Sequence, residues 1–184
     1  MKFNLRIFFG IFILTFTLIS CVDPEPRRPV SHHTSSYMQE SVKLNKHINA
    51  VEEKAILYYI AQDSLKKYTA SKNGFWYASI HQEINQNSKP VVGDTVLFEY
   101  EIFDLNNQLI YSKEEIGKIS YSIDKENLTT GLQEGLKLMR EGEDMQFLFP
   151  SFKAFGFTGD QEKIGKNQPL IYYVKLIEIN KKDE

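Results

Sequence analysis

The chain has 184 residues, of which 42% are hydrophobic and 25% are charged, with 22 Lys and Arg against 24 Asp and Glu. A formal net charge of −2 gives no basis for nucleic acid as a partner, because phosphate binding requires a clustered basic surface. The single cysteine excludes a disulfide framework and a cysteine-based zinc site within one chain. The length predicts one globular domain with additional segments.

The first segment of the chain has the pattern of a secretory signal. A short basic start, with Lys2 and Arg6, precedes an apolar run from Ile7 to Ile19. This run is shorter than the roughly 20 residues that a helix needs to cross a bilayer. Its length and its basic flank are those of a signal peptide, so we expect residues 1–20 to be removed.

The end of this segment, Leu18-Ile19-Ser20-Cys21, resembles a bacterial lipobox. The resemblance implies that lipid is attached to Cys21 and that the chain is cleaved just before it. An ordinary cysteine beside an ordinary signal is the alternative, but the position of the only cysteine favours lipidation. Residues 21–35, rich in proline, then form a lipidated anchor and an extended tether. We expect lipid anchoring in a bacterial cell envelope, with the domain facing the periplasm and either membrane possible.

Residues 36–71 predict an N-terminal amphipathic helical segment. Ser36 and Gln39 have the spacing of a capping box, and Gly74 is expected to end the helical pattern. Apolar residues recur at the spacing of one helix face, namely Ile48, Val51, Ala55, Tyr58, Leu65 and Tyr68. This face either packs on the following domain or binds a partner, and the pattern leaves both open.

The second half of the chain predicts a sheet built around one short helix. Strands are expected over 75–80, 95–104, 108–112, 119–123, 144–149 and 170–179. In the segment 131–139, apolar residues at i, i+4 and i+7 predict the helix. This order indicates an α+β domain with an antiparallel sheet of about five to six strands. The long connection over 150–169 is typical of a functional loop.

Four segments resemble the FKBP-type peptidyl-prolyl isomerases. Gly131–Glu143 is similar to the helix motif of this family, and Pro150–Gly156 to its Pro-x-x-x-Ala-Tyr-Gly loop. Gly93–Tyr100 resembles its Gly-Asp-x-Val strand, and Leu170–Ile179 its last strand. We therefore expect residues 72–181 to form one FKBP-type domain, a twisted sheet curled around the helix. The order of lipobox, helix and domain also resembles the gliding-motility-associated FKBP lipoproteins of Bacteroidetes.

The resemblance implies a prolyl-binding pocket that needs neither cofactor nor metal. The corresponding residues are Tyr100, Tyr111, Ile119, Leu128, Thr129, Leu132, Phe155, Ile164 and Tyr172. An apolar, aromatic-walled site favours the twisted transition state of an X–Pro bond over the planar ground state, which water solvates better. Aromatic residues that alternate on strands are more often core residues, and only the joint match to the family favours a pocket.

The chain departs from the family at four positions, three of them among these pocket residues and the fourth next to Tyr111. Ser112 stands where Asp is usual, and Phe155 stands where Tyr is usual. Leu132 replaces the commoner Trp, and Ile119 replaces an aromatic residue. Two lost neutral hydrogen bonds at ~0.5–1.5 kcal/mol each would lower affinity by one to two decades. We therefore expect reduced catalysis and weak binding of macrolide inhibitors.

Three functions are consistent with these features. The first is a membrane-anchored isomerase that assists folding of proline-containing polypeptides of the cell envelope, with a link to gliding motility. The second is a chaperone or binding module that keeps the FKBP fold with weak or no isomerase activity. The third is a structural component of an envelope gliding machine, with the helix over 48–68 as its interface.

Overall fold

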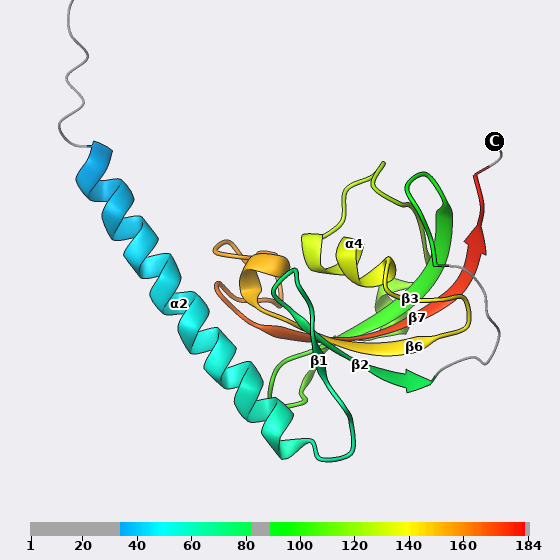
Figure 1. The fold of residues 1–184 in the computed structure, drawn as a ribbon, viewed down its shortest axis with the longest axis horizontal. Helices are drawn as coiled ribbons and strands as arrows, with labels where there is room; N and C mark the ends of the chain where they lie inside the picture. The colour runs from blue at the N-terminus through cyan, green and yellow to red at the C-terminus, as the bar shows by residue number, and fades with distance from the viewer. Residues whose placement is uncertain (1–33, 82–88, 183–184) are drawn as a thin grey trace, which may run out of the picture. The chain divides into compact units, whose positions relative to one another are not determined.

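The computed structural model describes residues 34–81 and 89–182, so the predicted signal peptide and Cys21 lie outside the described residues. The chain divides into two compact units, Met1–Gln39 and Glu40–Glu184. The elements of the second unit are α2 (Thr34–Gln62, shared with the first unit), β1 (Thr69–Ala70), β2 (Trp76–His81), β3 (Thr95–Phe103), β4 (Leu109–Tyr111), α3 (Lys113–Ile116), β5 (Ile119–Ser122), α4 (Thr130–Leu136), β6 (Asp144–Phe149), the 3-10 helix η1 (Ser151–Lys153) and β7 (Leu170–Asn180) (Figure 1).

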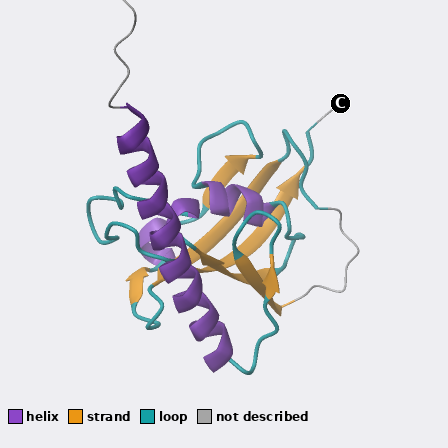
Figure 2. Ribbon diagram, turned by 60° about the vertical axis from the view of Figure 1, so that its left-hand side comes forward, coloured by secondary structure: helices purple, strands orange, loops and turns teal. Residues whose placement is uncertain are grey.

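Seven strands form one antiparallel sheet in the order β1-β2-β6-β7-β3-β4, with β5 also paired to β3. The pairing of β3 with β7 runs from Thr95 opposite Asn180 to Phe103 opposite Ile171. On its other side β3 pairs first with β5 and then with β4. Figure 2 shows these strands as one twisted layer. The predicted α+β class and antiparallel sheet are confirmed, and the two-residue β1 brings the number of strands in the described part of the chain to seven.

Alternation along β6 and β7 separates two apolar clusters on the two faces of the sheet. Phe147, Phe149 and Tyr172 lie in the larger cluster, together with Leu132 and Leu136 of α4. All five side chains are buried. Helix α4 therefore packs on this face, which we call the α4 face, as the pattern of its apolar residues predicts.

Two glycines bring α4 close to the strands. A Cβ atom on Gly131 would lie 2.6 Å from a ring carbon of Phe149, and one on Gly135 would lie 3.1 Å from the ring of Phe147. The first distance is too short for a real contact, so any side chain at Gly131 would displace the helix from β6. The spacing of four residues places both glycines on the face of α4 that meets the sheet.

The opposite face, which we call the α2 face, holds a smaller cluster. Ile56 of α2 is buried with Leu148 and Ile171, and Tyr59 and Ile60 pack against them. Beside this cluster, the amide nitrogen of the fully buried Gln146 donates to the hydroxyl of Tyr59 at 3.2 Å. The amide oxygen of Gln146 lies 3.0 Å from the hydroxyl of Tyr68. This side of the sheet thus combines apolar and polar contacts.

Only part of the apolar face predicted within residues 36–71 packs on the sheet, where Tyr68 joins the cluster around Ile56. Val51, Tyr58 and Leu65 are 54%, 70% and 94% exposed, whereas the buried positions are Glu52 and Ile56. Periodicity did not identify Glu52, because a search for apolar spacing rejects a charged residue. Binding of a partner by the exposed part of the apolar face stays a prediction.

The ends of α2 also differ from the prediction. The helix begins at Thr34, so Ser36 lies inside it, and it ends at Gln62, well before Gly74. One oxygen of Asp63 accepts the backbone N–H of Leu65, and the other accepts the side chains of Lys66 and Tyr68. These bonds turn the chain away from the helix. Among the described residues, no helix combines the length and apolar character needed to cross a bilayer. The domain boundaries after residues 35 and 71 remain predictions.

Candidate functional site

The residues predicted for the pocket gather at one apolar cluster, on the α4 face of the sheet. Leu132, Ile164 and Tyr172 are buried in it. Tyr100, Tyr111, Ile119, Leu128 and Phe155 are partly buried and pack against it. Thr129 immediately precedes α4 as its N-cap residue. A ligand that approaches from solvent would meet the partly exposed side chains first.

An aromatic column lies at the centre of this cluster. The ring of Tyr100 stacks on that of Tyr172, with centroids 5.4 Å apart and planes inclined by 19°. Phe98 also stacks on Tyr100, at 5.8 Å, and Phe149 meets Tyr172 edge-on at 5.1 Å. Both arrangements are favoured by the charge distribution of aromatic rings. The column fixes the orientation of Tyr100, its partly exposed member.

The phenols of this column are neutral at neutral pH. Burial raises the pKa of the Tyr100 hydroxyl above its ordinary value. Burial also raises the pKa of the Tyr172 hydroxyl, and the neighbouring Tyr100 adds to the effect. The column therefore offers uncharged aromatic surface, which suits an uncharged prolyl ring.

Tyr111 is held by a residue that the sequence pattern did not reveal. Its hydroxyl donates to Asp160 at 2.6 Å, and the other oxygen of Asp160 accepts the backbone N–H groups of Glu162 and Ile164 at 2.9 and 2.8 Å. The Lys163 ammonium lies 4.6 Å from the centre of the Tyr111 ring. Asp160 thus joins the long connection to the wall of the cluster. Gly159-Asp160 marks a turn in the sequence but does not identify the distant partner.

The hydrogen bond between Tyr111 and Asp160 shifts the pKa values of both groups. Burial opposes ionisation of Asp160, but the hydrogen bonds from Tyr111 and two backbone N–H groups outweigh it and lower the pKa of this carboxyl. The hydrogen bond to Asp160 is the largest influence on Tyr111 and raises the pKa of its phenol to about 12. At neutral pH the pair is a carboxylate that accepts from a neutral phenol.

The model of the FKBP-type peptidyl-prolyl cis-trans isomerase domain matches residues 86–177, half of the chain. The chain belongs to the FKBP family. It is 30% identical over 147 residues to "Probable FKBP-type peptidyl-prolyl cis-trans isomerase FkpA" of Neisseria meningitidis serogroup B, covering 76% of this chain and 50% of that protein. It is 28% identical over 130 residues to "Peptidyl-prolyl cis-trans isomerase Mip" of Coxiella burnetii, covering 71% and 55%. The chain therefore spans about half the length of these relatives.

Solved structures share the fold. The crystal structure of FkpA from Escherichia coli aligns with a TM-score of 0.59 and 20% identity, over 95% of this chain and 81% of that chain. A peptidyl-prolyl cis-trans isomerase from Pseudomonas syringae aligns with a TM-score of 0.57 and 17% identity, over 74% and 96%. At these identities the likeness concerns the FKBP fold alone.

Ser112 has a structural role in this FKBP domain. It is the N-cap residue of α3, and its hydroxyl accepts the backbone N–H of Glu115 at 3.3 Å. Asp caps helices about as well as Ser. The Asp that is usual in the family could therefore replace Ser112 without loss of the cap.

The loop of the FKBP domain that carries Phe155 is fixed by its own backbone and by α4. The carbonyl of Ser151 accepts the N–H groups of Ala154 and Gly156, on either side of Phe155, at 2.9 and 2.8 Å. The Lys153 ammonium forms an ion pair with Glu134 of α4 at 3.0 Å. These contacts set the backbone around Phe155 from two sides.

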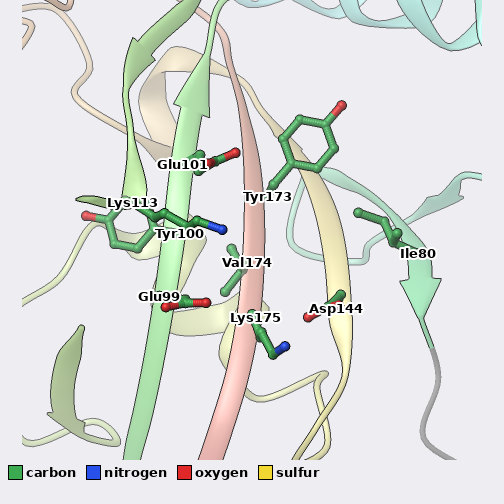
Figure 3. A pocket seen from close by; sticks show the side chains of 9 residues that line it. All are labelled: Ile80, Glu99, Tyr100, Glu101, Lys113, Asp144, Tyr173, Val174 and Lys175. Carbon is green, nitrogen blue, oxygen red and sulfur yellow. The ribbon is translucent and has the colours of Figure 1, made fainter. Parts of the chain in front are cut away.

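A groove of about 290 Å³ that no sequence pattern predicted crosses the strands of the FKBP sheet. Its lining comprises Ile80, Glu99, Tyr100, Glu101, Lys113, Asp144, Tyr173, Val174 and Lys175. Figure 3 shows carboxylates from β3 and β6 together with the ammonium groups of Lys113 from α3 and Lys175 from β7. Only Tyr100 belongs to the predicted pocket set. Within residues 34–81 and 89–182, no group of three or more His, Cys, Asp or Glu is arranged to hold a metal ion.

Proposed function

We propose that the chain is a membrane-anchored peptidyl-prolyl cis-trans isomerase that assists folding of exported proteins in a bacterial cell envelope. The observation that carries the proposal is the gathering of the predicted pocket residues around the Tyr100–Tyr172 column, within a chain of the FKBP family. The names of two relatives include the same activity. The substrates would be polypeptides that contain proline.

The chemistry requires no covalent intermediate. Rotation about an X–Pro bond crosses a barrier of about 18–20 kcal/mol, because the amide loses its resonance on twisting. A planar amide is well solvated by water, whereas the twisted state has a smaller carbonyl dipole and loses less on entering an apolar site. Differential binding of the twisted state therefore lowers the barrier. Tyr100, Phe155 and Tyr111 would contact the prolyl ring, and the buried Leu132 and Tyr172 would support them.

The proposed lipid anchor is inferred from the lipobox-like sequence that ends at Cys21. Two acyl chains on this residue would hold the mature chain at the membrane, since each buried CH₂ contributes about 0.8 kcal/mol. Replacing Cys21 with Ala should release the protein from the membrane fraction and abolish incorporation of labelled fatty acid. Continued labelling of Cys21→Ala would refute lipidation at this site. A link to gliding motility rests on the arrangement of the segments and would require a motility defect in a deletion strain.

The isomerase activity can be tested with a short X-Pro peptide whose cis-to-trans conversion is followed directly. Wild type should accelerate the conversion, and Tyr100→Ala should lower the acceleration at least tenfold. Ser112→Asp and Phe155→Tyr, which restore the usual residues of the family, should raise it, and the first keeps the cap on α3. A wild-type rate equal to the uncatalysed rate, with no gain in either variant, would remove the enzymatic part of the proposal.

The exposed apolar side chains of α2 favour a second function, that of a chaperone. Val51, Leu57 and Tyr58 are 54%, 46% and 70% exposed and offer surface to an unfolded chain. This function predicts that the protein suppresses aggregation of an unfolded client even when Tyr100→Ala has removed isomerase activity. The same surface would serve the third possibility, an envelope machine, and copurification of a stable complex that depends on these three residues would distinguish it.

A further inference from the structure

One carboxylate of α2 is buried against the loop that carries Phe155. Glu52 is only 4% exposed. One of its oxygens accepts the backbone N–H of Ser151 at 2.7 Å, and the other accepts the Ser151 hydroxyl, also at 2.7 Å. In the described part of the chain, no Lys or Arg forms an ion pair with Glu52. The buried charge is therefore held by two hydrogen bonds to a single residue, which are stronger than neutral ones.

Ser151 transmits this contact to the backbone around Phe155. Its carbonyl accepts the N–H groups of Ala154 and Gly156, and the carbonyl of Gly156 in turn accepts the N–H of Asn167 at 2.9 Å. All the polar groups of Ser151 are thus engaged, two with Glu52 and one with the turn that presents Phe155. A substitution of Glu52 would therefore alter the backbone of this turn before other parts of the domain.

Helix α2 is well placed to hold the carboxylate still. Ile56 lies one turn after Glu52 on the same face of the helix and is buried against Leu148 and Ile171. Leu148 belongs to β6, the strand that leads through Phe149 and Pro150 into Ser151. The apolar contact fixes the helix on the strand, and the carboxylate fixes the loop that follows. The two contacts can therefore be removed separately.

We infer that Glu52 is a positioning residue for the proposed isomerase, and that α2 supports the wall of the prolyl site by holding Ser151 and, through it, the turn at Phe155. This inference rests on the proposed function for its catalytic part. A segment outside residues 86–177, the part that the FKBP family model matches, then contributes to the geometry of the family's site. Loss of the Glu52 contact should loosen the turn without detaching the helix.

The decisive variants are Glu52→Leu and Glu52→Gln in the full chain, purified in detergent. Leu removes both acceptors. Gln keeps them in a changed form, because its amide oxygen can accept the Ser151 N–H while its NH₂ group donates to the Ser151 hydroxyl, which also accepts. Glu53→Leu, at an exposed neighbouring position, controls for the loss of a helix carboxylate. Ile56→Ala controls for weaker attachment of the helix.

Two readouts separate positioning from simple stabilisation. Amide hydrogen exchange at Ala154 and Gly156 should accelerate about tenfold or more in Glu52→Leu, because buried charge-assisted bonds are lost. It should change little in Glu52→Gln, Glu53→Leu and Ile56→Ala. The KM for the X-Pro peptide, measured where every variant is folded, should rise several-fold in Glu52→Leu with a smaller change in kcat, and Gln should restore it.

Unchanged exchange at both amides in a folded Glu52→Leu variant would overturn the inference. So would equal effects of Glu52→Leu and Ile56→Ala, which would show that Glu52 only attaches the helix. If Glu52→Leu does not fold, Ser151→Ala removes the hydroxyl bond alone and should still accelerate exchange at Gly156; no acceleration would count against the inference. An inactive wild type would refute the proposed function while the exchange data still decide whether Glu52 positions the loop.

Discussion

The two faces of the sheet use the same strands in different ways. On the α4 face, Phe147 and Phe149 stack at 5.5 Å within a cluster of aromatic and aliphatic side chains. On the α2 face, Leu148 is buried beside a hydrogen-bonded group around Gln146. Adjacent residues of β6 thus support different functions, the candidate site on one side and the attachment of α2 on the other. Because successive side chains of β6 point to opposite faces, the position of a residue along the strand decides whether its substitution affects the candidate site or the attachment of α2.

Among the variants considered for the two faces, Phe147→Ala should cause the largest fall in the free energy of unfolding. The side chain is fully buried and touches three other aromatic rings. We expect the free energy of unfolding in urea to fall by about 3–5 kcal/mol, the usual cost of such a truncation. Leu148→Ala, the next residue on the other face, should cost about 2–5 kcal/mol and leave the isomerase activity of the folded protein unchanged. If Leu148→Ala lowered activity as much as Phe147→Ala, the two faces would not be separable.

A smaller loss is expected for Gln146→Leu on the α2 face. The substitution removes the partner of the Tyr59 and Tyr68 hydroxyls, which normally costs about 1–3 kcal/mol for a buried group. The low end is expected, because Tyr59 also donates to Asn107 and Tyr68 also donates to Asp63. Urea unfolding followed by the fluorescence of Trp76, which packs on this face, measures the loss. The exposed Gln108→Leu is the control, and a stabilised Gln146→Leu variant would show that the polar group adds nothing.

The α4 face was predictable from the sequence and the α2 face was not. Alternation along the strands placed Tyr172 and Val174 on one side, and the apolar spacing over 131–139 predicted the helix that covers them, because both signals are local. The contact of Glu52 with Ser151 joins residues 99 positions apart and depends on a buried charge. Asp160 and Tyr111 are likewise 49 positions apart. No periodic pattern encodes such pairs, so polar contacts between distant segments emerge only from the folded chain.

Asp160→Asn tests the polar edge of the α4 face. The hydrogen bond from Tyr111 weakens when its acceptor loses the negative charge, so the KM for an X-Pro peptide should rise, by less than tenfold because the pair is partly exposed. Because the pKa of Asp160 is lowered in the folded protein, its contribution to stability is complete above the unfolded value, about 3.9, and is lost as pH falls through the folded pKa.

Unfolding of wild type between pH 5 and 2 should therefore show a steeper loss of stability than unfolding of Asp160→Asn. Asp63, whose pKa is also lowered, provides the matched variant on the α2 face, since burial there is outweighed by bonds from Lys66 and Tyr68. Asp63→Asn should flatten the same profile without altering KM. Equal changes in KM for the two variants would contradict the separation of the faces.

The smallest effect is expected for Val51→Ser on α2. Apolar periodicity assigns Val51 to a face that either packs on the domain or binds a partner. Val51 is 54% exposed, and its neighbour Glu52 is buried. An exposed substitution away from caps and contacts usually changes the free energy of unfolding by no more than about 0.5 kcal/mol, and Ser loses little helix propensity relative to Val. Ile56→Ser, on the buried face, should be far more destabilising. A contrary result would be a fall of more than about 2 kcal/mol in the free energy of unfolding for Val51→Ser that grows with protein concentration. It would mean that the exposed face of α2 binds another chain in solution, while the opposite face packs on the sheet.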